Sequence, residues 1–104
     1  MAQVKVVFFI PIKDNDGREL VTEKNDLEME LYLRFVGWTF LGIVQGAYRM
    51  EDGTRAIDEH RAYAIVLDES RIPEVEEVLR EFKAKTTQEA IYLEVQYHVE
   101  LRLV

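Results

Sequence analysis

Apolar and polar positions recur along the chain with two periods, about two residues in strands and 3.6 residues in helices. The change from one period to the other marks where each strand or helix ends. Segments rich in Val, Ile and Phe, or alternating strictly between apolar and polar side chains, predict strands. Asp52-Gly53 favours a tight hairpin with a two-residue loop between the two middle strands. The four predicted strands span residues 3–13, 38–50, 55–67 and 91–104.

Two segments between these strands have helical spacing. The first helix is expected to be capped by Thr22, or by Asn25 with Glu28, and to end at Gly37. The second is expected to begin near Ser70 as its cap. It tolerates Pro73 in its first turn and buries one stripe, Val75, Val78, Leu79 and Phe82. The first helix carries two stripes, which are Leu27, Leu31 and Phe35 on one side and Met29, Leu33 and Val36 on the other.

The order of elements is therefore β-α-β-β-α-β. This order predicts an α+β ferredoxin-like plait, a four-stranded antiparallel sheet with two helices on one face, as a single domain over residues 1–104. The last strand would span about 45 Å at roughly 3.3 Å per residue, more than double a typical strand. Its end is expected to bend, or to leave the domain and pair with a neighbouring subunit.

The second face of the sheet has no helix to cover it. With a two-residue loop, Tyr48 opposes Ile57 and Gly46 opposes Glu59, and opposed residues point to the same side. The strand with Ala62, Ala64 and Val66 would turn these small residues to the helices. The predicted open face then collects Trp38, Phe40, Gly42, Val44, Gly46, Tyr48, Met50, Ile57, Glu59, Arg61, Tyr63, Ile65 and Leu67. So large an apolar face usually marks a partner or ligand site.

Composition narrows the possible functions. The chain has 104 residues, 20 acidic and 13 basic side chains, a net charge of -7 and no cysteine. It therefore has no disulfide, no cysteine nucleophile and no thiolate metal site, and its acidic balance makes nucleic acid an improbable partner. The early apolar run, residues 4–12, is too short to cross a bilayer and lacks the pattern of a signal peptide. We expect a cytoplasmic protein with no membrane partner.

Two groups of polar residues are candidates for chemistry. Tyr48, Glu59 and Arg61 fall on neighbouring strands, where a carboxylate among apolar groups could act as an acid or base. The favoured interpretation is an ion pair between Glu59 and Arg61 at a subunit interface. The second group is Glu94, Gln96, His98 and Glu100 in a row on one strand face, a pattern typical of the wet side of a strand. We predict no metal site, no cofactor and no catalytic residue, and lean towards a protein that is not an enzyme.

The segment Arg61-Ala62-Tyr63-Ala64-Ile65-Val66 is similar to the third-strand signature of RNA-recognition motifs, which share this topology. Ala62 and Ile65 depart from that signature, and the net charge opposes RNA binding.

Short motifs also resemble a bacterial family of uncharacterised small proteins. The motifs are Gly46-Ala47-Tyr48-Arg49, then Asp52-Gly53, Glu59, Lys83 and Gln88-Glu89-Ala90-Ile91, which match G-x-W-R, a turn glycine, E-x-S and Q-E-S/A-V segments. The resemblance implies a ferredoxin-like fold and marks Tyr48, Arg49, Glu59 and Gln88. It implies no activity.

Three hypotheses follow. The leading one is a homo-oligomer, a dimer or larger, that buries its open sheet face or the second stripe of its first helix against another copy. The alternatives are an RNA-recognition-like module and a ligand-binding protein or enzyme. The latter would have a pocket for a small, partly apolar molecule, lined by Trp38, Phe40, Tyr48, Glu59, Arg61 and Tyr63.

Overall fold

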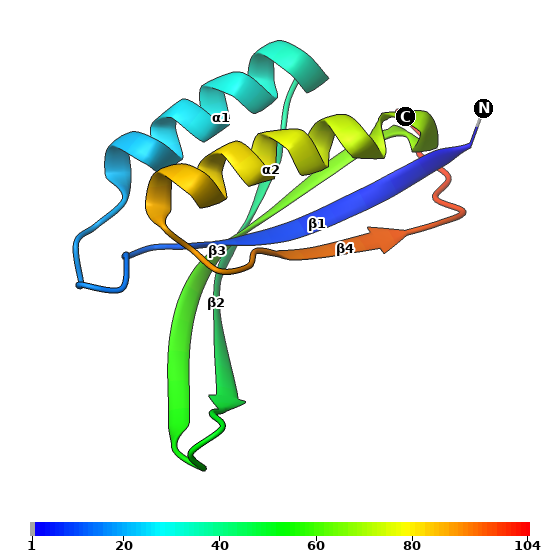
Figure 1. Cartoon of the computed structure of the whole chain (residues 1–104). Coiled ribbons are helices and arrows are strands. Elements are labelled where there is room, and N and C mark those ends of the chain that lie inside the picture. Colours follow the sequence, from blue (N-terminus) through cyan, green and yellow to red (C-terminus); the bar gives the residue numbers. More distant parts are fainter. Residues whose placement is uncertain (1) are drawn as a thin grey trace.

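The computed structural model describes residues 2–104 as one antiparallel sheet with two helices on one face (Figure 1). The strand order is β2-β3-β1-β4, so β3 and β1 are the two central strands and β2 and β4 are the edges. This confirms the predicted α+β, ferredoxin-like fold. The elements are β1 (Gln3–Pro11), α1 (Val21–Phe35), β2 (Thr39–Arg49), β3 (Arg55–Asp68), a short 3-10 turn (Glu69–Arg71), α2 (Ile72–Thr86) and β4 (Tyr92–Gln96).

The core lies between the sheet and the helices. Tyr63 is fully buried at its centre, where its ring stacks on Phe8 at 5.6 Å between centroids and meets the edge of Trp38 at 5.5 Å. The single stripe of α2 and the first stripe of α1 are buried there as predicted. The sheet contributes Val4, Val6, Phe8, Ile10, Tyr63, Ile65 and Leu67.

The register of the β2–β3 hairpin differs from the prediction by one residue. The loop has three residues, because the Met50 amide donates to the Thr54 carbonyl at 2.8 Å and Gly53 takes a φ of 85°. The carboxylate of Asp52 accepts from the amide and hydroxyl of Thr54 and holds the turn. Arg49 therefore opposes Arg55, and the residues of β3 face the side opposite to the one predicted, both in the hairpin and in the rest of the strand.

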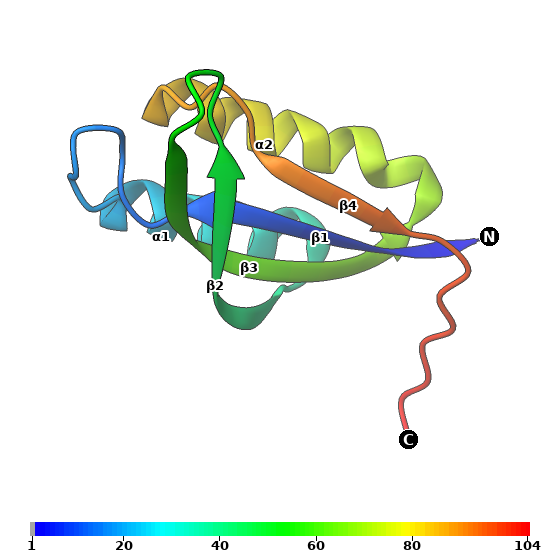
Figure 2. The ribbon, with the colours of Figure 1, turned by 90° about the horizontal axis from the view of Figure 1, so that it is seen from below.

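This shift reverses the assignment of the sheet faces. Tyr63, Ile65 and Leu67 point to the helices rather than to the open face, and Ala62 and Ala64 point away from the helices. A bulge at Leu41 changes the register again, so that Phe40 opposes Tyr63 on the helix side. The open face, which is turned to the viewer in Figure 2, lacks Phe40 and Tyr63, two of the aromatic residues predicted there. Its central residues are Val7, Phe9, Ala62, Ala64, Val66 and Tyr92.

The ends of the helices also depart from the prediction. α1 begins at Val21 after Leu20, with no side-chain cap from Thr22 or Asn25, because buried Leu20 anchors the first turn in the core. At its end Val36, not Gly37, takes the left-handed conformation, with φ 71°.

Asp68 caps the 3-10 turn that leads into α2, whereas α2 itself has no side-chain cap. The Asp68 carboxylate accepts from the amide and hydroxyl of Ser70, which is therefore the donor rather than the cap. Hydrogen bonds to Ser70 hold the pKa of the Asp68 carboxyl below its usual value.

The last strand is much shorter than the predicted residues 91–104. β4 pairs only with β1, and its final residue, Gln96, opposes Lys5 near the beginning of that strand. With almost no partner strand beyond this point, the chain turns at His98, which has a φ of 61°. Of the two outcomes predicted for the C-terminal segment, a bend or pairing with a neighbouring subunit, the single chain shows the bend, which lies where β1 offers almost no further partner.

The far end of the β2–β3 hairpin forms an arm. β1 ends opposite His60, so residues 45–49 and 55–59 pair only with each other. Figure 1 shows this hairpin arm leaving the sheet on the side away from the helices. Two-stranded hairpins are marginal in water, which makes the arm dependent on what packs beside it.

Candidate functional site

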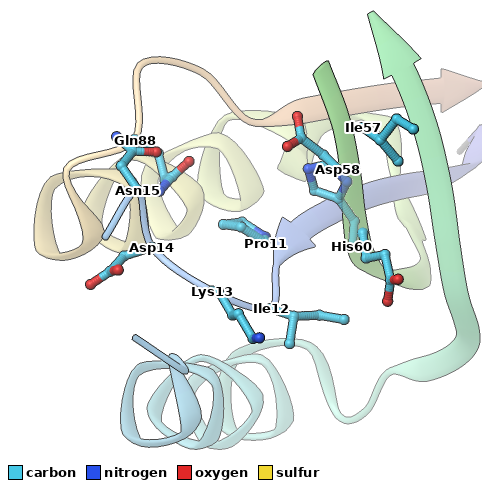
Figure 3. Close-up of a pocket in the computed structure, with 10 residues that line it drawn as sticks. Pro11, Ile12, Lys13, Asp14, Asn15, Ile57, Asp58, His60 and Gln88 are labelled. Atoms are coloured by element: carbon cyan, nitrogen blue, oxygen red, sulfur yellow. The ribbon is translucent and has the colours of Figure 1, made fainter. Parts of the chain in front are cut away.

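A cavity of about 500 Å³ lies at the base of the hairpin arm (Figure 3). We call it the hairpin-base pocket. It is bounded by the end of β1 with the loop that follows, by β3 where the arm begins, and by the turn after α2. Its lining residues are Pro11, Ile12, Lys13, Asp14, Asn15, Ile57, Asp58, Glu59, His60 and Gln88.

The loop at one wall is shaped by Asp14. Its carboxylate accepts from the amides of Asp16 and Arg18 at 2.9 Å, and the Arg18 guanidinium contacts it at 3.2 Å. These bonds, led by the Arg18 amide, hold the pKa of Asp14 below its ordinary value, so the group stays ionised at neutral pH. Gly17, with a φ of 84°, completes the turn. The wall is therefore a preformed polar loop.

The opposite wall comes from β3 and the turn after α2. Asp58 and His60 point to one side of β3 and Glu59 to the other, because successive side chains alternate. In Figure 3 Gln88 and Asn15 lie across the cavity from Asp58. The amide of Gln88 donates to the Lys83 carbonyl at 3.1 Å, which fixes this turn beside the pocket. Three carboxylates and one lysine line the cavity, so it favours a cation or a ligand rich in hydroxyl groups.

The six predicted ligand-binding residues do not share one pocket. Glu59 lines the hairpin-base pocket, while Trp38 and Arg61 line two other hollows. Tyr48 points to the open side, whereas Phe40 and Tyr63 point to the helix side, and Tyr63 is fully buried. The single aromatic pocket predicted from Trp38, Phe40, Tyr48, Glu59, Arg61 and Tyr63 is therefore not formed. The reason is that the β2–β3 register differs by one residue from the predicted register.

The predicted ion pair is not formed within this chain either. Among residues 2–104 no salt bridge joins Glu59 to Arg61, and the Arg61 guanidinium lies 5.8 Å from the centre of the Phe40 ring. Tyr48 lies back along its own strand, over Gly46. A Cβ at position 46 would come within 2.6 Å of the Tyr48 hydroxyl oxygen, which explains why the Gly46-Ala47-Tyr48 motif carries a glycine.

The RNA-like segment and the polar row of the last predicted strand are arranged differently from what the sequence suggests. Tyr63, the aromatic residue of the RNA-like segment, faces the helices and has no exposed ring on which a base could stack. The polar row Glu94, Gln96, His98 and Glu100 is broken at His98, where the strand has ended. Within the described part of the chain, no three His, Asp or Glu side chains are grouped closely enough to hold a metal ion.

A second candidate surface lies along α1 and β2. We call it the α1–β2 surface, and its exposed residues are Met29, Tyr32, Leu33, Val36, Phe40, Leu41 and Ile43. It contains a groove of about 470 Å³ lined by Asn25, Glu28, Met29, Tyr32 and Trp38. The second stripe of α1 is thus unburied, as the sequence predicts, and the edge strand β2 adds to it.

This groove has a rigid floor. The indole of Trp38 donates to the Glu28 carbonyl at 3.0 Å, and the Tyr63 hydroxyl donates to the Glu28 carboxylate at 2.5 Å. Burial, and then the hydrogen bond to Glu28, raise the pKa of Tyr63 above its ordinary value, so the phenol remains a donor. Lys24 lies 3.6 Å from Glu28 and balances its charge. Among residues 2–104 no buried side-chain polar atom is left without a partner.

Sequence reasoning missed part of the hairpin-base pocket. Glu59 and Gln88 were marked by the family resemblance, but Lys13, Asn15 and Asp58 carried no signal beyond a polar turn and an exposed strand. Only the tertiary fold brings the three segments together.

Comparison with known proteins supports the fold. No family model matches the sequence, and no curated protein matches it. Solved structures do match. The CutA1 protein of Oryza sativa is 12% identical, with a TM-score of 0.71 over 98% of this chain and 84% of that one. A phage SAM lyase in complex with S-methyl-5'-thioadenosine is 14% identical, with a TM-score of 0.68 over 91% and 81%. The CutA protein of Synechococcus elongatus is 9% identical, with a TM-score of 0.59 over 95% and 80%.

These likenesses define the class of the chain, a small α+β protein with the ferredoxin-like arrangement. Neither α1 nor α2, the two α-helices within residues 2–104, has the length and apolar content that crossing a bilayer requires.

Proposed function

We propose that this protein works as a cytoplasmic homo-oligomer whose subunits associate through the α1–β2 surface. The observation that carries the proposal is the run of exposed apolar side chains across α1 and the edge strand β2. Met29, Leu33 and Val36 leave 59%, 74% and 87% of their surface in contact with water. Isolated exposed apolar residues are common, but several on one helix face, with a groove and an unpaired strand edge beside that helix, favour an interface.

Self-association suits this surface because a second copy supplies the same apolar chemistry. Most small oligomers are assemblies of identical subunits. The open sheet face on the other side of the sheet, where Phe9 stacks on Tyr92 at 4.5 Å, would offer a second contact area.

Methionine oxidation tests the interface. Met29 lies on the α1–β2 surface and Met50 at the tip of the hairpin arm, and they are 59% and 49% exposed in the single chain. Treated with dilute hydrogen peroxide, Met29 should oxidise several-fold more slowly at high protein concentration than at low, while Met50 provides the internal control. Mass spectrometry of the peptides measures both. Equal rates at Met29 across the concentration series would contradict the proposal.

A second candidate function uses the hairpin-base pocket. We propose that it binds a nucleoside thioether or sulfonium compound of the kind bound by the phage SAM lyase. Carboxylates can accept hydrogen bonds from a ribose diol and attract a sulfonium charge, and the pocket holds Asp58 and Glu59. The resemblance to the bacterial family supports the same place, because Glu59 and Gln88 are two of its marked positions.

Calorimetry with S-methyl-5'-thioadenosine and S-adenosylmethionine tests this second function. Binding should be lost or weakened at least tenfold in Glu59→Gln and Asp58→Asn. Glu77→Gln, an exposed change on α2, is the matched control and should bind as the unmodified chain does. Absence of heat with both compounds, or equal binding by Glu59→Gln and Asp58→Asn, would remove the pocket from consideration for this ligand class.

A further inference from the structure

We propose that residues 97–104 of one copy add as a β-strand to the free edge of β2 in a second copy, beneath the groove of the α1–β2 surface. This inference rests on the proposed homo-oligomer and names the segment that joins its subunits.

The donor segment has the sequence of a strand but pairs with no strand among residues 2–104. Apolar residues continue to alternate with polar ones past the end of β4, as Tyr97, Val99, Leu101 and Leu103. Figure 2 shows the segment leaving the sheet at an angle with no strand beside it. Tyr97, Leu101 and Leu103 are 54%, 48% and 93% exposed. The side-chain contact recorded within this segment is a local one, between Arg102 and Glu100 at 2.7 Å.

The acceptor is the outer edge of β2. This strand has eleven residues, or about 36 Å, and in the order β2-β3-β1-β4 of the described chain only one of its edges is paired. Its other backbone groups are open to a second strand. Eight residues of an extended segment span about 26 Å and fit along it. The outer edge of β4 is the alternative, but its five residues offer only about 17 Å.

The side chains of donor and acceptor are complementary. On β2, Phe40 and Ile43 point to the helix side and are 42% and 50% exposed. A strand added there with its apolar residues on the helix side would pack against them and beneath Met29 and Tyr32, which line the groove. The same orientation turns the polar residues His98, Glu100 and Arg102 to the open side, where they remain in water.

The segment cannot make this pairing with its own β2. Four strand spacings of about 4.8 Å separate β4 from a position outside β2, a distance of about 19 Å. Crossing it would use about six of the eight residues at roughly 3.3 Å each. Too few would remain to form a strand, so the edge that receives the segment belongs to another copy. Such a contact joins two different surfaces, and a closed ring of copies would leave no donor segment and no β2 edge unpaired.

Disulfide trapping tests the pairing directly, because the chain has no cysteine of its own. Cysteine replaces Ile43 on β2 and, in three separate variants, Val99, Leu101 or Leu103 on the donor. Mild oxidation should link chains to one another in at least one of the three, since residues opposed across strands come within disulfide distance. The matched control carries Leu101→Cys with Ala84→Cys on the exposed side of α2 and should not form linked chains.

A backbone variant separates this inference from the proposed function. Val99→Pro removes an amide donor from the segment and should raise the dissociation constant of the assembly at least tenfold, whereas Val99→Ala, which keeps the amide, should raise it much less. Both changes lie outside the core. An assembly that survives Val99→Pro, with no linkage to position 43, would overturn the strand addition and leave the homo-oligomer standing. Linkage within single chains would also overturn it, and a monomeric unmodified chain would overturn both proposals.

Discussion

Leu33→Glu is the sharpest test of the α1–β2 surface. Leu33 is 74% exposed in the single chain, and full burial of a leucine side chain contributes about 1.5–3 kcal/mol. Losing three quarters of that contribution weakens each subunit contact by about 1–2 kcal/mol, and desolvating the new carboxylate adds to the loss. Since about 1.4 kcal/mol corresponds to a factor of ten, the dissociation constant should rise at least tenfold.

The change is mild for the fold itself. Leucine and glutamate have similar helix propensities, and position 33 lies on the far side of α1 from the core. Ala84→Glu on α2 is a matched control, because it also places a glutamate at an exposed helix position three residues after another glutamate. Sedimentation velocity over a dilution series measures both variants. The reasoning fails if Leu33→Glu associates as tightly as the unmodified chain, or if Ala84→Glu weakens association equally.

Three other predictions concern stability and the hairpin arm. Tyr63→Phe loses the hydrogen bond to Glu28, which should lower the free energy of unfolding by about 1.5–3 kcal/mol. In calorimetry the melting temperature should fall by roughly 10 °C. An unchanged melting temperature would contradict the role of this bond. Burial raises the pKa of Tyr63 in the folded chain. The contribution of its phenol to the free energy of unfolding is therefore intact below about pH 10, the pKa in the unfolded chain, and falls as the pH rises beyond it. Urea titrations should show this decline in the unmodified chain and a smaller one in Tyr63→Phe. Gly46→Ala should displace the Tyr48 ring, which NMR of tyrosine-labelled protein would detect as shifted ring resonances. The stability should change little, since only the end of a flexible side chain must move. Unshifted resonances would show that the ring does not lie over this glycine.

The fold was readable from the sequence because each element has a strong period of its own. The single stripe of α2 and the alternation in β4 each define one buried face, and the structure keeps both. The second stripe of α1 was also correctly read as surface that this chain does not bury. These features depend on local spacing alone.

The sheet faces were not readable, because they depend on a single residue in a turn. Asp52-Gly53 is compatible with a loop of two or three residues, and only the hydrogen bonds around Asp52 select three. A register shift of one residue exchanges the two faces of a strand. The two-residue loop therefore predicts Tyr63 on the open face, whereas the three-residue loop of the structure goes with Tyr63 in the core. The bulge at Leu41 has no sequence signal beyond the nearby glycine.

The candidate site was predicted only in part for a related reason. Glu59 and Gln88 are 29 positions apart and belong to different elements, so their proximity depends on how β3 and the end of α2 meet the loop after β1. The length of β4 depends on where its partner strand begins, not on its own pattern. Alternation past Gln96 therefore does not by itself extend β4.

The mass of the unmodified protein in solution tests the central claim most directly. At micromolar concentration, sedimentation equilibrium should give a single species at an integer multiple, two or more, of the 12.2 kDa chain, and dilution should release the monomer. A mass of 12.2 kDa throughout the micromolar range would contradict the account, because the apolar side chains of α1 and β2 would then face water without a partner.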